Sequence, residues 1–214
     1  MMALILYGDR HWESPYVFSC FVALLEKQIP FEVKEIGLDR GEHREPGYAK
    51  KTTLARVPAV EHEGYTLAES QAILEYLEEA FPEAPRLLPD DIRERARARM
   101  VLGWLRSDLL ALRQERSTTT MFFAEHRTNR PLSRDARAAA DRLLTIADRL
   151  IPEGCTQLFA TWSIADADLA FMLHRLIVNG DHVPSRIRTY AQANWGRSSV
   201  QSYVQHPRPA YAPH

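Results

Sequence analysis

The sequence is poor in cysteine and lacks long apolar runs. Its 214 residues include two cysteines, Cys20 and Cys155, a number that favours a reducing compartment over a disulfide-bonded exterior. No stretch approaches the ~20 apolar residues of a membrane-spanning helix. The N-terminus also lacks the basic flank, apolar core and cleavage site of a secretory leader. We therefore expect a cytoplasmic protein without a membrane partner.

An excess of one charge and the spacing typical of metal ligands are also absent. The 27 basic residues nearly balance the 28 acidic ones, which leaves a formal net charge of -1 and no sign of a nucleic-acid partner. The eight histidines are scattered, with no H-x₃-H or C-x₂-C pair, so we expect no metal site. The length suits one large domain or two small ones.

The most informative stretch runs from residue 55 to residue 77. It predicts a strand, a turn at Glu63-Gly64, a return strand and a helix with apolar residues at helical spacing. Pro58 lies near the start of the first strand, where it indicates a sheet edge, a strand start or a cis bond. Glu69 and Ser70 bring a carboxylate and a hydroxyl to the start of the helix, beside free backbone N–H groups.

The preceding residues predict alternating strands and helices. An apolar strand over residues 3–7 is followed by Ser14-Pro15, a strong helix start, and that helix ends before Pro30. Residues 31–36 alternate as a second strand, and residues 38–54 form a polar loop with a short helix. The order is strand, helix, strand, helix, strand, strand, helix, which indicates an α/β domain over residues 1–81.

Residues 82–89 form the expected linker, because three prolines in this stretch interrupt regular structure. Residues 90–214 carry helical patterns almost throughout and predict an all-helical domain. One long helix should run from Asp91 past Leu112, and others should start at Ser133, Ser163, Ser185 and Ser198. The proline-rich tail over residues 206–214 is expected to fray.

Four motifs occur in a specific order over nearly the whole chain. They are Ser14-Pro15-Tyr16, Arg56-Val57-Pro58, Glu69-Ser70 followed by Ala72-Ile73 and Tyr76-Leu77, and a capping box from Ser163 to Asp166. Together they resemble the cytosolic glutathione transferases. The Ser14 helix start, the segment over residues 104–109 and the C-terminal stretch look most like a bacterial branch with glutathione-dependent peroxidase or disulfide-reductase members. The resemblance implies a thioredoxin-like first domain, an all-α second domain that completes the co-substrate site, and a homodimer.

The resemblance also implies a role for individual residues. Glutathione would be the co-substrate, the backbone of Val57 would pair with its cysteinyl part, and Pro58 would be cis. Glu69 and Ser70 would hold its γ-glutamyl end, and the Ser14 hydroxyl would face its sulfur. Physical chemistry adds Arg56 as a partner for the glycyl carboxylate, although a solvated loop charge is the simpler alternative.

The sequence departs from the family pattern just before Arg56. The loop that often reads Asn-Pro-x-Gly is here Thr-Thr-Leu-Ala over residues 52–55, so no role follows for Lys50 or Lys51. Cys155 has no assigned role either. Because neither position 14 nor position 17 holds a cysteine, a thioredoxin-type dithiol mechanism is excluded at this site.

Ser14 has the chemistry that thiol activation requires. A thiol of pKa about 8.5 is only slightly ionised near neutral pH, and lowering its pKa by about two units needs roughly 2.7 kcal/mol. A helix N-terminus supplies about 0.3–1 kcal/mol, and a hydrogen bond to a charged acceptor adds roughly 1.5–3 kcal/mol. A serine at a helix start supplies both, whereas a plain N-cap remains the simpler alternative for Ser14 and for Ser70.

The sequence therefore favours an enzyme in which Ser14 stabilises a glutathione thiolate. The thiolate would attack a hydrophobic electrophile, a peroxide or a disulfide. Two alternatives stay open: a non-catalytic glutathione-binding protein of the same fold, and a glutathione-dependent isomerase.

Overall fold

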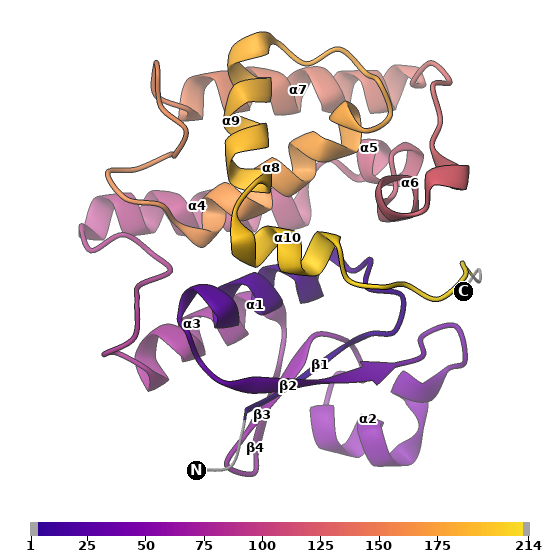
Figure 1. The fold of residues 1–214 in the computed structure, drawn as a ribbon, viewed down its shortest axis with the longest axis vertical. Coiled ribbons are helices and arrows are strands. Elements are labelled where there is room, and N and C mark those ends of the chain that lie inside the picture. Colours follow the sequence, from indigo (N-terminus) through magenta and orange to yellow (C-terminus); the bar gives the residue numbers. More distant parts are fainter. Residues whose placement is uncertain (1–3, 212–214) are drawn as a thin grey trace. The chain divides into compact units, whose positions relative to one another are not determined.

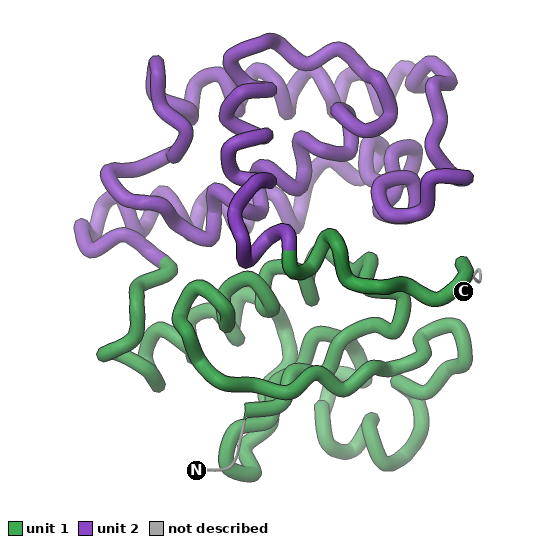
Figure 2. The backbone as a smooth tube through the Cα atoms, viewed as in Figure 1, with its two compact units in different colours: residues 1–87, 202–214 green, residues 88–201 purple. Residues whose placement is uncertain are grey.

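The computed structural model describes residues 4–211, which form two compact units. Of the described residues, one unit combines residues 4–87 with residues 202–211, and the other comprises residues 88–201 (Figure 2). The boundary after Leu87 falls inside the linker expected over residues 82–89. The sequence-based division places residues 90–214 in the helical domain, whereas the contacts of the chain group residues 202–211 with the first unit.

The first unit is built on a four-stranded sheet. Its strands are β1 (Leu4–Asp9), β2 (Phe31–Ile36), β3 (Ala59–His62) and β4 (Tyr65–Ala68), in the order β2-β1-β3-β4. β1 and β2 are parallel, and the other two pairs are antiparallel. The predicted turn at Glu63-Gly64 connects β3 to β4, and both of its residues have positive φ.

Helices cover both faces of this sheet (Figure 1). α1 (Pro15–Glu26) and α3 (Ser70–Ala80) pack together on one face, while α2 (Pro46–Thr52), preceded by a 3₁₀ turn, η1 (Glu42–Arg44), lies on the other. A Cβ at Gly8 would lie 2.9 Å from a methyl group of Val17, so glycine lets α1 pack closely against the end of β1. The expected thioredoxin-like fold is confirmed.

The second unit is helical. It contains α4 (Ile92–Ser107), α5 (Leu110–Glu115), α6 (Thr118–Phe122), η2 (Ala124–His126), α7 (Arg134–Leu150), α8 (Ile164–Ile177) and α9 (Ser185–Trp195). α8 is buried over residues 164–176 and contacts α4, α6, α7 and α9, so it forms the centre of the unit. α10 (Ser198–Val204) begins in this unit and ends in the first one.

Two sequence-based expectations are wrong in detail. The long helix from Asp91 past Leu112 is broken after Ser107, because Asp108 is extended and Leu109 has a φ of 63°. The tail was expected to fray, yet residues 206–208 are held by rings and hydrogen bonds within the first unit. Residues 212–214 of the tail lie outside the described residues.

Between residues 4 and 211, none of the helices is long and apolar enough to cross a membrane.

Candidate active site

The sheet brings the predicted site residues of the first unit to one edge. β1 runs antiparallel to β3 with Tyr7 opposite Ala59, so the end of β1 lies beside the start of β3. Ala59 is also opposite Ala68, which places Val57-Pro58 next to Glu69-Ser70. α1 begins shortly after β1, and α3 begins directly after β4. The thiol of Cys20 on α1 lies 3.9 Å from the carbonyl oxygen of Ser70, so the two helices meet near this edge.

Ser14 is the N-cap of α1, as predicted. Its Oγ accepts a hydrogen bond of 3.3 Å from the backbone N–H of Val17, and Pro15 is the first helical residue. The side chain is half-buried. A hydroxyl oxygen that accepts one hydrogen bond keeps its own proton for donation, so the cap role and a donor role are compatible.

Asp9 holds the loop that carries Ser14. Its carboxylate oxygens accept from the backbone N–H groups of Glu13 at 2.8 Å and of Ser14 at 3.2 Å. The carboxylate is buried, and this burial raises the pKa of Asp9, against the lowering effect of its two backbone donors. Sequence reasoning missed this residue, although an aspartate between a strand and a helix start is a recognisable acceptor for loop N–H groups.

The peptide bond between Val57 and Pro58 is cis, as the family resemblance implies. Pro58 is buried, Val57 is half-buried and the Arg56 side chain is exposed. The carbonyl oxygen of Arg56 accepts from the Tyr48 hydroxyl of α2 at 2.8 Å. This bond ties the start of β3 to α2 and leaves the guanidinium at the surface.

Glu69 and Ser70 occupy the start of α3, with one difference from the prediction. The N-cap is Glu69, and Ser70 is the first helical residue, so Ser70 does not precede the helix. Glu69 has a φ of 78° and a ψ of 113°, a conformation that L-residues rarely adopt and that costs of order 1–3 kcal/mol. Its side chain is exposed, while Ser70 is buried.

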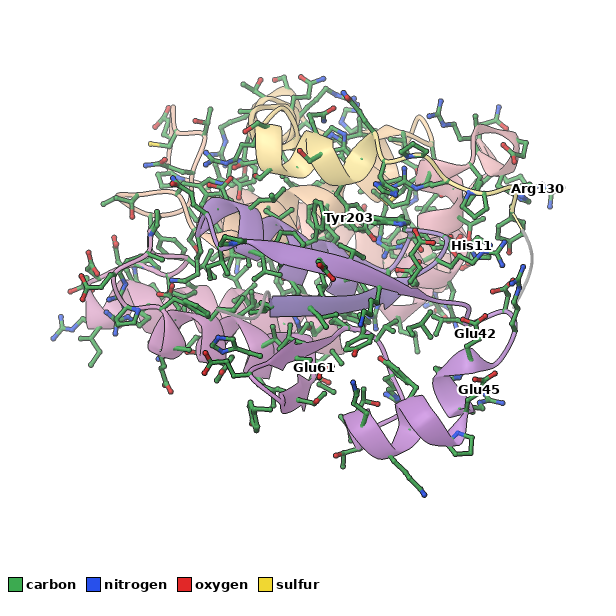
Figure 3. The ribbon with its side chains drawn as sticks, turned by 60° about the horizontal axis from the view of Figure 1, so that its bottom comes forward. His11, Glu42, Glu45, Glu61, Arg130 and Tyr203 are labelled. Atoms are coloured by element: carbon green, nitrogen blue, oxygen red, sulfur yellow. The ribbon has the colours of Figure 1, made fainter. Side chains whose placement is uncertain are left out.

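Lys51, which has no role predicted from the sequence, contacts two residues of the sheet. Its ammonium contacts the carboxylate of Glu61 on β3, labelled in Figure 3, at 2.7 Å and the hydroxyl of Tyr7 at 3.1 Å. The same carboxylate accepts from the Tyr7 hydroxyl at 2.6 Å. Hydrogen bonding to Lys51 lowers the pKa of Glu61. Lys50 and Cys155 are exposed.

The arrangement offers a hydroxyl donor, a helix N-terminus, a free backbone edge before Pro58 and a carboxylate with a buried serine. These groups suit a small zwitterionic peptide with a thiol. Within residues 4–211, no group of three or more histidine, cysteine or carboxylate side chains is arranged to hold a metal ion.

Comparison with protein families identifies both units. Residues 2–79 match the glutathione S-transferase N-terminal domain, and residues 91–207 match the glutathione S-transferase C-terminal domain. The chain belongs to the glutathione S-transferase family. The family resemblance drawn from the four sequence motifs is thereby confirmed.

Individual members of the glutathione S-transferase family are similar to this chain. A glutathione transferase homolog from Burkholderia, crystallised with bound glutathione, is 35% identical, with a TM-score of 0.78 over 95% of this chain and 97% of that one. A maleylacetoacetate isomerase from Dictyostelium discoideum is 38% identical over 110 residues, which are 50% of this chain and 49% of the relative. Mouse glutathione S-transferase theta-1 is 34% identical over 111 residues, 50% of this chain and 44% of the relative. The match thus spans about half the length of these curated relatives.

Sequence reasoning also missed two residues that contact the Ser14 loop. The Tyr203 hydroxyl donates to the carbonyl oxygen of Ser14, and the guanidinium of Arg208 donates to that of Trp12. They lie 189 and 196 residues further along the chain than their partners, and no local pattern at either position signals the contact.

Proposed function

We propose that this protein is a glutathione-dependent enzyme that uses Ser14 to stabilise the thiolate of bound glutathione. The observation that carries the proposal is the meeting of the Ser14 helix start, the cis Val57–Pro58 bond and the Glu69-Ser70 helix start at one sheet edge. Family membership and the glutathione-bound relative of 35% identity give independent support.

The thiolate would be stabilised by two groups. The Ser14 hydroxyl would donate to the sulfur, a charge-assisted bond worth roughly 1.5–3 kcal/mol. The N-terminus of α1 adds about 0.3–1 kcal/mol. The sum meets the roughly 2.7 kcal/mol that a two-unit fall in the thiol pKa requires. Ser14 acts here as a hydrogen-bond donor and forms no covalent bond.

The remaining groups would bind the peptide part of glutathione. The backbone of Val57 pairs with the cysteinyl part in the manner of a neighbouring strand. Glu69 attracts the ammonium of the γ-glutamyl end, and the N-terminus of α3 with Ser70 receives its carboxylate. The exposed Arg56 guanidinium pairs with the glycyl carboxylate.

Calorimetric titration with reduced glutathione tests the site directly. We expect saturable binding to the native protein and its loss in the Glu69→Ala, Ser70→Ala double variant, because both ends of the γ-glutamyl contact are removed. A Ser133→Ala, Asp135→Ala double variant at the start of α7 is the control, since it alters a helix start outside the site. Absence of binding to the native protein would overturn the proposed function and would mean that this fold serves a function without glutathione.

The glutathione reaction has two candidate classes. Attack on an electrophile, peroxide or disulfide follows from the activated thiolate. Glutathione-dependent isomerisation is favoured by the similarity to maleylacetoacetate isomerases, of 38% identity in the Dictyostelium protein. Turnover assays with an electrophile, a peroxide, a disulfide and a cis-configured dicarboxylic acid separate the two: an isomerase regenerates glutathione, whereas the other reactions consume it.

We further propose that the protein is a homodimer. Tyr65 on β4 is 53% exposed, and Ile92 and Met100 on α4 are 76% and 57% exposed. Large apolar side chains at these exposures are suited to an interface with a second copy.

A further inference from the structure

The last described residues of the chain lie against the loop that carries Ser14. We name residues 203–208 the C-terminal strap. Tyr203, on α10 and labelled in Figure 3, donates its hydroxyl to the carbonyl oxygen of Ser14 at 3.0 Å. The same carbonyl accepts from the backbone N–H of Phe18 at 2.9 Å, the first hydrogen bond of α1. Both acceptor positions of the Ser14 carbonyl are therefore used.

Arg208 makes a second connection between the strap and the loop. Its Nε and Nη2 donate to the carbonyl oxygen of Trp12 at 3.1 and 2.9 Å. The guanidinium also donates to the strap's own carbonyl oxygens, of Tyr203 at 3.0 Å, Val204 at 2.7 Å and His206 at 2.9 Å. A planar group with five N–H donors thus folds the strap and fastens it to the loop at once.

Ring packing completes the contact. The His206 ring stacks on the Trp12 ring with centroids 3.5 Å apart and an interplanar angle of 18°. Tyr203 packs on Trp12 and Phe21 with centroids 5.4 and 5.6 Å away. Trp12 has a φ of 51°, in the left-handed region that a bulky residue rarely adopts. The strap therefore contacts a residue in a rarely adopted conformation, two positions before Ser14.

We propose that Tyr203 and Arg208 are positioning residues for Ser14. The loop is clamped from two sides: Asp9 holds the N–H of Ser14, and the strap holds the carbonyl oxygens of Ser14 and Trp12. A hydroxyl that stabilises a thiolate must be fixed to within about 0.5 Å, and hydrogen bonds on both sides of its own backbone supply that precision. The inference rests on the proposed function for its chemical consequence.

The first readout is the pKa of the bound glutathione thiol, which is measured from the ultraviolet absorbance of its thiolate. Tyr203→Phe removes one hydroxyl, and we expect the pKa of the bound thiol to rise by about 0.5–1 unit, which is a roughly 3- to 10-fold increase in the affinity of the thiolate for a proton. Tyr190→Phe is the matched control, because that tyrosine is equally buried and its hydroxyl donates to Asp166 in the second unit. The Tyr190→Phe variant should be less stable than the native protein, and the pKa of its bound thiol should be unchanged.

Arg208→Lys and the Ser14→Ala, Tyr203→Phe double variant test whether the change in thiol pKa acts through Ser14. Lysine keeps the charge but loses the planar guanidinium with its several N–H donors, so the thiol pKa should rise as in Tyr203→Phe. Arg186→Lys is the control, because it weakens comparable guanidinium contacts with Ile151 and Asp148, and it should leave the thiol pKa unchanged. In a Ser14→Ala background, Tyr203→Phe should add nothing further. A full additional rise there would overturn the assignment to Ser14.

Hydrogen exchange separates this inference from the proposed function, because it needs no glutathione. Amides of residues 12–18 should exchange faster in Tyr203→Phe and Arg208→Lys than in the native protein, and not in Tyr190→Phe. Unchanged exchange overturns the positioning role, whatever the protein binds. Faster exchange in the two variants, together with no glutathione binding by the native protein, would support the positioning role and overturn the proposed function.

Discussion

Ser14 combines two roles that substitution can separate. As the N-cap of α1 it stabilises the helix, and as the proposed donor it stabilises a thiolate. Ser133 matches its first role, since its Oγ accepts from the N–H of Ala136 at 3.3 Å, the same distance as from Ser14 to Val17.

We expect Ser14→Ala and Ser133→Ala to lower the free energy of unfolding by similar amounts, about 1 kcal/mol each, because each removes one cap. Only Ser14→Ala should slow glutathione-dependent turnover, by roughly 10- to 100-fold, the loss of one hydrogen bond to a charged sulfur. Chemical denaturation and steady-state kinetics measure the two effects. Equal turnover in both variants would remove Ser14 from the mechanism.

His174 makes the stability of the protein depend on pH. It is buried in α8, stacked on Trp195 with centroids 4.0 Å apart, and its Nδ1–H donates to the carbonyl oxygen of Ala170. Burial lowers the pKa of His174 from 6.5 to about 4. The unfolded chain therefore binds a proton at a higher pH than the folded chain does, so stability is retained above pH 6.5 and is lost as the pH falls toward 4.

The His174→Gln variant, which keeps a side-chain donor and cannot titrate, should lose less stability on acidification. Between pH 7.5 and pH 4.5 we expect the native protein to lose about 2.5 kcal/mol more than the variant does. Urea denaturation at each pH measures the difference, and His182→Gln, at an exposed position, is the control. Identical pH profiles for all three proteins would contradict the buried-neutral assignment.

At the scale of elements, helix starts were easier to predict than helix ends. Ser14-Pro15, Ser133 and the Ser163 capping box all begin helices, because the side chain that satisfies the first N–H groups is adjacent in sequence. The break at Leu109 was missed because apolar residues continue at helical spacing on both sides of it.

The start of α8 shows what a buried cap contributes. Asp166 accepts from the N–H of Ser163 at 2.9 Å, from that of Leu158 at 2.8 Å and from the Tyr190 hydroxyl at 2.8 Å. It thus fixes the preceding loop and α9 as well as its own helix.

Asp166→Ala should therefore cost about 3–5 kcal/mol, because three buried donors lose their acceptor. Asp91→Ala, at the exposed N-cap of α4, removes two hydrogen bonds and should cost only about 1 kcal/mol. Thermal and chemical unfolding compare the two variants. A small cost for Asp166→Ala would mean that water replaces the carboxylate.

At the scale of the whole molecule, the proposed dimer depends on exposed apolar residues. Met100→Glu on α4 should raise the dissociation constant of the dimer at least about 10-fold, because it places a charge in an apolar contact. Sedimentation velocity over a range of concentrations measures this change. Ala138→Glu, which adds the same charge at an exposed position on α7, is the control. A native protein that is monomeric at every concentration would contradict the proposal.

Most of the site was predictable because its residues follow one another within short segments of the first unit. The strand and helix patterns place Pro58, Glu69 and Ser70 at a strand start and a helix start, and the family resemblance implies their roles. Tyr203 and Arg208 could not, since their contacts with Ser14 and Trp12 exist only in the folded chain. Local patterns record which backbone groups a segment must satisfy, and they contain no information on distant partners.

The chain leaves the first unit after residue 87 and returns to it at residue 202 (Figure 2). At a synthesis rate of about 5–20 residues per second, roughly 6–23 s pass between the synthesis of residue 87 and that of the C-terminal strap, which contacts Trp12 and Ser14. A nascent chain that ends before residue 203 can hold the Ser14 loop through Asp9 alone. The loop can gain its second set of hydrogen bonds only when translation of the strap is complete, so an unfinished chain would lack half of the contacts that position the proposed thiolate-stabilising serine.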